Sequence, residues 1–149
     1  MKNYNLFELN NLIKSICNAH PLINDYFINK YRVVESDNIN YPLLACTVNY
    51  ITSAENTLTF NVNMLYADRL TDQRDNEITV QSIGVSSLIE VVNALKELAP
   101  VAVDDSYNIT PFTEQFADNC AGVFATLNIE TPHYIGQCNW VDKTCIDCI

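Results

Sequence analysis

The chain has 149 residues, of which 48% are hydrophobic and 17% are charged, a composition typical of a single folded domain. Eighteen acidic residues against eight Lys and Arg give a net charge of −10, which argues against tight binding to nucleic acid or to an anionic membrane. No apolar run approaches the roughly 18 residues of a membrane span, and the N-terminus lacks a secretory signal pattern. These features predict a protein that is made and kept in a cytosol.

The beginning of the chain predicts a helix over residues 5–18. Asn5, followed three residues later by Glu8, matches an N-terminal capping box, and His20-Pro21 marks the end, where the imidazole is expected to bond the last carbonyls. Residues 23–35 are weakly patterned and indicate short strands or an extended arm. The apolar face of the predicted helix contains Leu6, Leu9, Leu12, Ile13, Ile16 and Cys17.

The middle of the chain predicts a β-hairpin. Residues 43–51 form an apolar strand that begins buried on both faces, and residues 52–56 form the loop. In residues 57–66, apolar and polar side chains alternate, which is typical of a strand with one buried face and one solvent-exposed face. The apolar positions of this strand are Leu58, Phe60, Val62, Met64 and Tyr66.

An acidic loop over residues 67–76 separates this hairpin from a second predicted helix, which ends near residue 98. Residues 101–111 are irregular, with room for a short strand, and residues 122–130 alternate again as a last strand. The apolar face of the second helix is predicted to contain Ile78, Val85, Leu88, Ile89, Val92 and Leu95.

The order of these elements predicts an α+β fold, in which two helices pack on an antiparallel β-sheet. Residues 1–132 are expected to form one domain, and residues 133–149, which show no period, an irregular C-terminal arm. Its lone Trp140 and neighbouring apolar side chains are costly in water, so the arm is expected either to fold back on its own domain or to strap onto a neighbouring subunit.

The six cysteines fall into two groups. Cys17 and Cys46 lie on predicted core faces, where a free thiol behaves as a small hydrophobic side chain. The arm cysteines leave three interpretations open, namely free thiols, a disulfide or a zinc site, although the second half of a paired-cysteine knuckle is missing. The residues concerned are His133, Cys138, Cys145 and Cys148.

The acidic loop interleaves charges of both signs, which leaves a solvated loop, a subunit contact and a divalent metal site as alternatives. The calcium-loop pattern is absent, and so are the nucleophile-elbow, P-loop and dinucleotide patterns, so no enzyme, cofactor or metal is predicted. The candidate subunit-contact residues are Asp68, Arg69, Asp72, Arg74 and Asp75, together with Trp140 of the arm.

Several short motifs spread over residues 11–129 carry a family resemblance. They are His20-Pro21-x-x-Asn24, Tyr41-Pro42-Leu43, Asn56-Thr57-Leu58-Thr59-Phe60, Asp68, Asn76-Glu77-x-x-Val80-Gln81-Ser82 and Phe116-x-Asp118-Asn119-x-Ala121-Gly122-Val123. Together they resemble neck and tail-completion proteins of Bacteroidales-infecting tailed phages, crAss-like phages included. The order of the elements is similar to that of tail-terminator proteins.

The resemblance implies a virion structural protein without enzymatic activity. Such proteins form rings, here a hexamer or a dodecamer, between the head connector or portal and the tail, and DNA passes through the ring. Neighbouring portal, neck and tail proteins would be its partners. A soluble adaptor or assembly factor that never forms a ring is the alternative, and a small enzyme is the third hypothesis.

Overall fold

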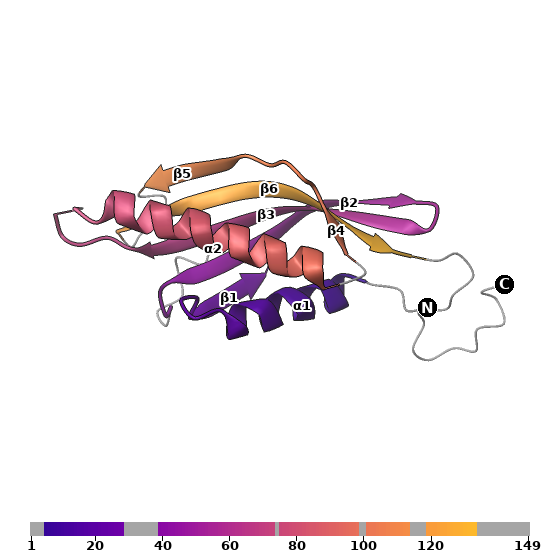
Figure 1. Cartoon of the computed structure of the whole chain (residues 1–149), viewed down its shortest axis with the longest axis horizontal. Helices are drawn as coiled ribbons and strands as arrows, with labels where there is room; N and C mark the ends of the chain where they lie inside the picture. Colours follow the sequence, from indigo (N-terminus) through magenta and orange to yellow (C-terminus); the bar gives the residue numbers. More distant parts are fainter. Residues whose placement is uncertain (1–4, 29–38, 74, 99–100, 114–118, 134–149) are drawn as a thin grey trace.

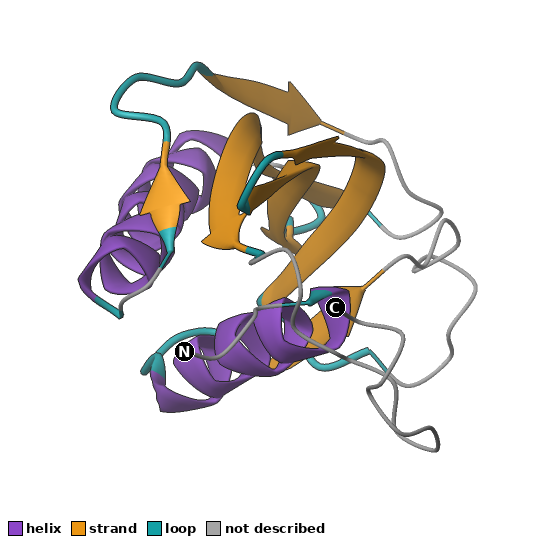
Figure 2. Cartoon of the chain, turned by 90° about the vertical axis from the view of Figure 1, so that its right-hand side faces the viewer, coloured by secondary structure: helices purple, strands orange, loops and turns teal. Residues whose placement is uncertain are grey.

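The computed structural model describes residues 5–28, 39–73, 75–98, 101–113 and 119–133. These residues form a six-stranded sheet with two helices, which confirms the α+β class expected from the sequence. The helices lie side by side on one face of a twisted sheet (Figures 1 and 2). Among the described residues, no helix covers the opposite face, so the two faces of the sheet differ chemically.

The first helix, α1 (Leu6–Ala19), begins as its sequence predicts. The side chain of Asn5 accepts a hydrogen bond from the backbone N–H of Glu8 at 2.9 Å, which satisfies one of the free donors at the helix start. The face toward the core is close to the predicted one. Its buried residues are Leu9, Ile13, Ile16 and Cys17.

The second helix, α2 (Glu77–Glu97), is rotated relative to its predicted apolar face. Ile78 is 77% exposed and Ile89 is 38% exposed, so the prediction that these two side chains face the core is wrong. The buried face includes the small residues Gly84 and Ser87, which let the helix approach the sheet but add nothing to an apolar pattern. By length and composition alone, α2 is also long and apolar enough to cross a membrane, a test that the core helix of a soluble protein passes as well.

The sheet has the strand order β1-β2-β3-β6-β4, and β5 also pairs with β6. Its pairs are antiparallel, as expected, except β1–β2, a parallel pair at the edge that the sequence did not predict. A parallel pair needs a long connection, which residues 29–42 supply. The strands are β1 (Asp25–Ile28), β2 (Leu43–Ala54), β3 (Thr57–Arg69), β4 (Ala102–Val103), β5 (Ile109–Thr113) and β6 (Cys120–Pro132).

The hairpin of β2 and β3 is longer than predicted at both ends. Ala54 pairs with Thr57, so only Glu55 and Asn56 form the turn, and Asn56 adopts the left-handed conformation (φ 66°). At the other end, β3 continues to Arg69, because its backbone pairs with β6 as far as Cys120. Part of the predicted acidic loop therefore belongs to a strand.

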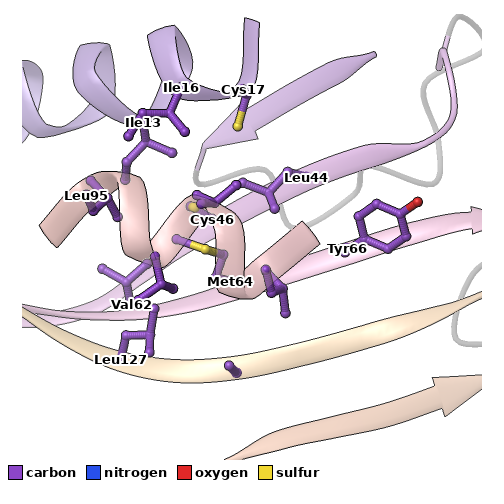
Figure 3. Packing of buried hydrophobic residues seen from close by; sticks show 14 of the residues in the cluster. Ile13, Ile16, Cys17, Leu44, Cys46, Val62, Met64, Tyr66, Leu95 and Leu127 are labelled. Atoms are coloured by element: carbon purple, nitrogen blue, oxygen red, sulfur yellow. The ribbon is translucent and has the colours of Figure 1, made fainter. Parts of the chain in front are cut away.

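The main core lies between the helices and the central strands. Figure 3 shows side chains of α1 and α2 meeting those of β2, β3 and β6. A smaller apolar cluster occupies part of the opposite face of the sheet, around the buried Leu43, Ala67 and Phe112. The largest fully buried side chains include Phe60, Tyr66, Leu88, Leu95, Leu127 and Ile129.

Candidate functional site

A polar pocket of about 650 Å³ opens where β1 and β2 begin and β3 ends. These three strand ends meet because β1 and β2 run parallel and β3 returns antiparallel to β2. The fold thereby joins two of the predicted contact residues to segments about 30 and 45 positions away in the chain. The pocket is lined by Asn24, Ile39, Asn40, Tyr41, Asp68 and Arg69.

Arg69 lies at this pocket with unused hydrogen-bonding capacity. Its guanidinium carbon is 5.0 Å from the centroid of the Tyr41 ring, a cation–π arrangement that orients the side chain. Within the described part of the chain, Arg69 forms no ion pair within 4.0 Å. A guanidinium held on an aromatic ring is well suited to bind a carboxylate from another molecule through two parallel hydrogen bonds.

Asp68 adds a partly desolvated carboxylate to the pocket. Burial raises its pKa, and the backbone N–H and positive charge of Arg69 oppose that rise. The N–H of Arg69 donates to Asp68 Oδ1 at 2.7 Å. The pocket therefore holds one positive and one negative group side by side.

The pocket wall is fixed by hydrogen bonds between segments that are distant in the sequence. Asn24 Nδ2 donates to the carbonyl of Tyr41 at 2.7 Å, and the backbone N–H of Asn40 donates to Asp25 Oδ2 at 2.7 Å. Sequence reasoning did not identify Asn24, Asn40 or Tyr41 as site residues. The only available signal was that Asn24 and Tyr41 occur in the motifs that carry the family resemblance.

The rest of the acidic loop is closed by its own hydrogen bonds. Asn76 Oδ1 accepts from the N–H of Thr71 at 2.9 Å, and Asn76 Nδ2 donates to the carbonyl of Arg69 at 3.2 Å. The hydroxyl of Thr71 donates to the carboxylate of Asp75. Asp72 and Asp75 are exposed and do not line the pocket. The other two predicted contact residues, Arg74 and Trp140, lie outside the described residues.

His20 links the two helices. Its Nε2 is 2.7 Å from Glu90 Oε2 on α2, and its Nδ1 accepts from the N–H of Leu22 at 3.1 Å. The neutral ring with the proton on Nε2 satisfies both contacts. The expected bond from the imidazole to the last carbonyls of α1 is wrong, because the backbone N–H of His20 makes it, to Ile16 and Cys17.

Cys17 and Cys46 are buried, as predicted, and lie in the core with Tyr26. Burial raises the pKa of the Cys17 thiol to about 12 and also raises the pKa values of Cys46 and Tyr26. The Tyr26 hydroxyl donates to Asn10 Oδ1 at 3.0 Å. Cys120 is buried as well, whereas Cys138, Cys145 and Cys148 lie outside the described residues.

These pKa values predict thiols that are inert while the protein is folded. Iodoacetamide at pH 8 is expected to alkylate Cys17 and Cys46 only after unfolding, because the thiolate is the reactive form. Peptide mapping by mass spectrometry measures this directly. Alkylation of the native protein at the rate of the unfolded chain would contradict the buried placement.

The same thiols predict that stability falls in alkali. In the unfolded chain a thiol ionises near its ordinary pKa of 9.0, whereas folded Cys17 keeps its proton until about pH 12. Between these values the unfolded state binds fewer protons, so the free energy of unfolding decreases as pH rises, by up to about 1.4 kcal/mol per pH unit for this group. Urea unfolding at pH 8, 9 and 10 measures the slope.

No protein-family model and no curated protein matches the chain. The geometry of the pocket therefore carries the functional argument. Within the described ranges, no group of three or more His, Cys, Asp or Glu side chains is placed to hold a metal ion, and the ring of His20 bonds Glu90 and Leu22 rather than a nucleophile. An arginine beside a carboxylate in an open pocket is suited to contact with another molecule.

Proposed function

We propose that the chain is a structural protein that assembles into a ring in the neck or tail of a phage virion. The ring joins the portal or head connector to the tail and lets DNA pass. One observation carries this proposal. The β2–β3 hairpin is long, so its two ends lie far apart, and these ends differ chemically. The motif resemblance described above supplies the virion context.

The hairpin separates two surfaces of different character. One end is the turn at Glu55 and Asn56, where residues 53–56 are all exposed and project beyond the helices (Figure 1). The other end is the pocket that contains Arg69. Since β3 has 13 residues, the two ends lie about 40 Å apart at ~3.3 Å per residue. A ring requires such a pair, because one patch of each copy must meet a different patch of the next.

The charge distribution favours Arg69 as a contact residue. Two copies that each carry a net charge of −10 repel each other, so positive charge is needed where they meet. Arg69 is the only arginine among the described residues, and its guanidinium is open to a carboxylate of a neighbouring copy. The remaining acidic surface suits a lumen through which DNA moves without binding.

Charge reversal at Arg69 tests this proposal. Arg69→Glu is expected to weaken assembly by about 2 kcal/mol per contact, roughly thirtyfold in the dissociation constant, because it places like charges together. Native mass spectrometry over a range of protein concentrations measures the loss of oligomer. Lys96→Glu on α2 is the matched control, since it makes the same charge change at an exposed position outside the pocket.

Unchanged assembly of Arg69→Glu would contradict the proposed contact. A wild-type chain that stays monomeric at every concentration, also with neighbouring neck proteins present, would favour the alternative of a soluble adaptor or assembly factor. Mass spectrometry of purified virions separates the two functions further. A small fixed ratio to the portal protein is expected for a ring, and absence from virions for an assembly factor.

A further inference from the structure

The face of the sheet opposite the helices carries a continuous row of amide and hydroxyl side chains. The row lies over the hairpin half of the sheet, beyond the small apolar cluster around Leu43 and Phe112. The strand register places side chains from three strands on this face, because residues paired across antiparallel strands point to the same side. They are Thr47, Asn49, Tyr50 and Thr52 of β2, Thr59, Asn61 and Asn63 of β3, and Thr126 and Asn128 of β6.

Hydrogen bonds connect five of these residues in a single chain across the three strands. The hydroxyl of Thr126 donates to Asn63 Oδ1 at 2.7 Å, and Asn63 Nδ2 donates to Asn49 Oδ1 at 3.4 Å. Asn49 Nδ2 then donates to Asn61 Oδ1 at 2.9 Å, and Asn61 Nδ2 donates to Asn128 Oδ1 at 2.8 Å. These bonds fix the amide orientations, so the row is preorganised.

The row keeps unused hydrogen-bonding capacity. A carboxamide has two N–H donors and an oxygen that accepts two bonds. The chain of bonds uses one donor and one acceptor position of Asn49, and one acceptor position of Asn128. Both residues are exposed, so their remaining donors and acceptors are available to a ligand. A sugar hydroxyl both donates and accepts, and therefore fits a surface that alternates donors with acceptors.

Tyr50 adds a flat apolar platform to the row. It is 60% exposed and lies in register with Asn61, beside the bulge that also brings Asn49 to this face. An exposed aromatic ring beside amide groups offers a sugar both a stacking surface for its C–H face and partners for its hydroxyls. We propose that this amide–tyrosine face binds an uncharged polysaccharide.

The charge of the face selects this ligand over others. The row itself contains no charged side chain, and the acidic residues Asp104 and Glu130 lie at its margin. Without Lys or Arg, the face does not favour nucleic acid or acidic polysaccharides, and the chain's net charge repels both. A protein partner would favour an apolar centre, which amides and hydroxyls do not provide.

Affinity electrophoresis of the full chain tests the proposal. Native gels containing dextran, yeast mannan, galactomannan or laminarin are expected to retard the protein in at least one case, and gels containing the acidic polymer alginate are not. Tyr50→Ala, Asn49→Ala and Asn128→Ala are expected to weaken retardation about tenfold, which corresponds to ~1.4 kcal/mol.

Matched controls come from the helix side of the molecule. Asn93→Ala on α2 removes an exposed amide, and Phe7→Ala on α1 removes an aromatic ring that is 70% exposed, so both should leave retardation unchanged. Circular dichroism melts verify that each variant is folded. Tyr50→Ala removes no hydrogen bond of the row, so it tests the face even if an asparagine variant unfolds.

Two results would overturn the proposal. One is the absence of retardation by every uncharged polymer, in which case the row serves only to hold the strands in register. The other is retardation that persists unchanged in folded Tyr50→Ala and Asn128→Ala proteins. Both results leave the ring proposal untouched, because Arg69 does not belong to this row and lies at the other end of β3.

Discussion

Replacing Gly122 with alanine is expected to destabilise the protein more than any other single substitution proposed for this chain. A Cβ at this position would lie 1.8 Å from the carbonyl oxygen of Tyr66, 2.8 Å from the carbonyl carbon and 3.0 Å from Cα of Ala67. All three are backbone atoms of β3, so no rotamer change relieves the contact. Gly122 therefore permits the close approach of β3 and β6, the pair at the centre of the sheet.

The expected loss of stability for Gly122→Ala exceeds about 4 kcal/mol, a value reached only by severe steric or core defects. Soluble yield and urea unfolding measure it. Gly84→Ala is the matched control, since its Cβ would meet side-chain atoms, Tyr66 Cδ1 at 2.8 Å and Val123 Cγ2 at 3.0 Å, which can shift. Helix propensity also favours alanine there by about 1 kcal/mol.

The control is therefore expected to stay folded, with a net change of about 1–2 kcal/mol in either direction. If Gly122→Ala were as stable as Gly84→Ala, the close approach of the two central strands would be wrong.

Leu88→Ala is expected to destabilise the protein by about 3–4 kcal/mol, because it removes a fully buried side chain from the face of α2 that packs on the sheet. Ile78→Ala on the same helix is expected to change the free energy of unfolding by no more than about 0.5 kcal/mol, since this side chain is 77% exposed. Urea unfolding of dilute protein measures both variants. The pair decides which face of α2 lies in the core.

A large effect of Ile78→Ala in dilute protein would contradict the observed orientation of α2. An effect that appears only at high protein concentration has a different meaning, because it indicates that Ile78 becomes buried when copies associate. The comparison at two concentrations therefore also reports on assembly through the outer surface of α2.

The elements that could be predicted from the sequence are those whose pattern is complete within one segment. Alternation in residues 57–66 and 122–130 located the two central strands, and both are half-buried as expected. Asn5 located the start of α1, because its cap contact reaches only three residues along the chain. The predicted ends are less accurate, since β2, β3 and β6 all extend beyond their predicted bounds.

The candidate site could be predicted only in part. Asp68 and Arg69 are predicted contact residues because charges of both signs are interleaved in this part of the sequence. Apart from the motifs of the family resemblance, nothing in the sequence marks their partners Asn24 and Tyr41 as site residues, and the pocket exists only because three strand ends meet. The sequence also placed Arg69 in a loop, whereas pairing with Cys120 makes it the end of a strand.

The sequence by itself determined the two central strands, the first helix with its cap, the burial of Cys17 and Cys46, and the acidic charge. Each of these follows from the residue types and from a backbone period of two or 3.6 within one segment. The tertiary structure decided the parallel β1–β2 edge, the buried face of α2 with its small residues, the Arg69 pocket and the asparagine row. Each of these depends on contacts between residues distant in the chain, and a local period contains no information about those contacts.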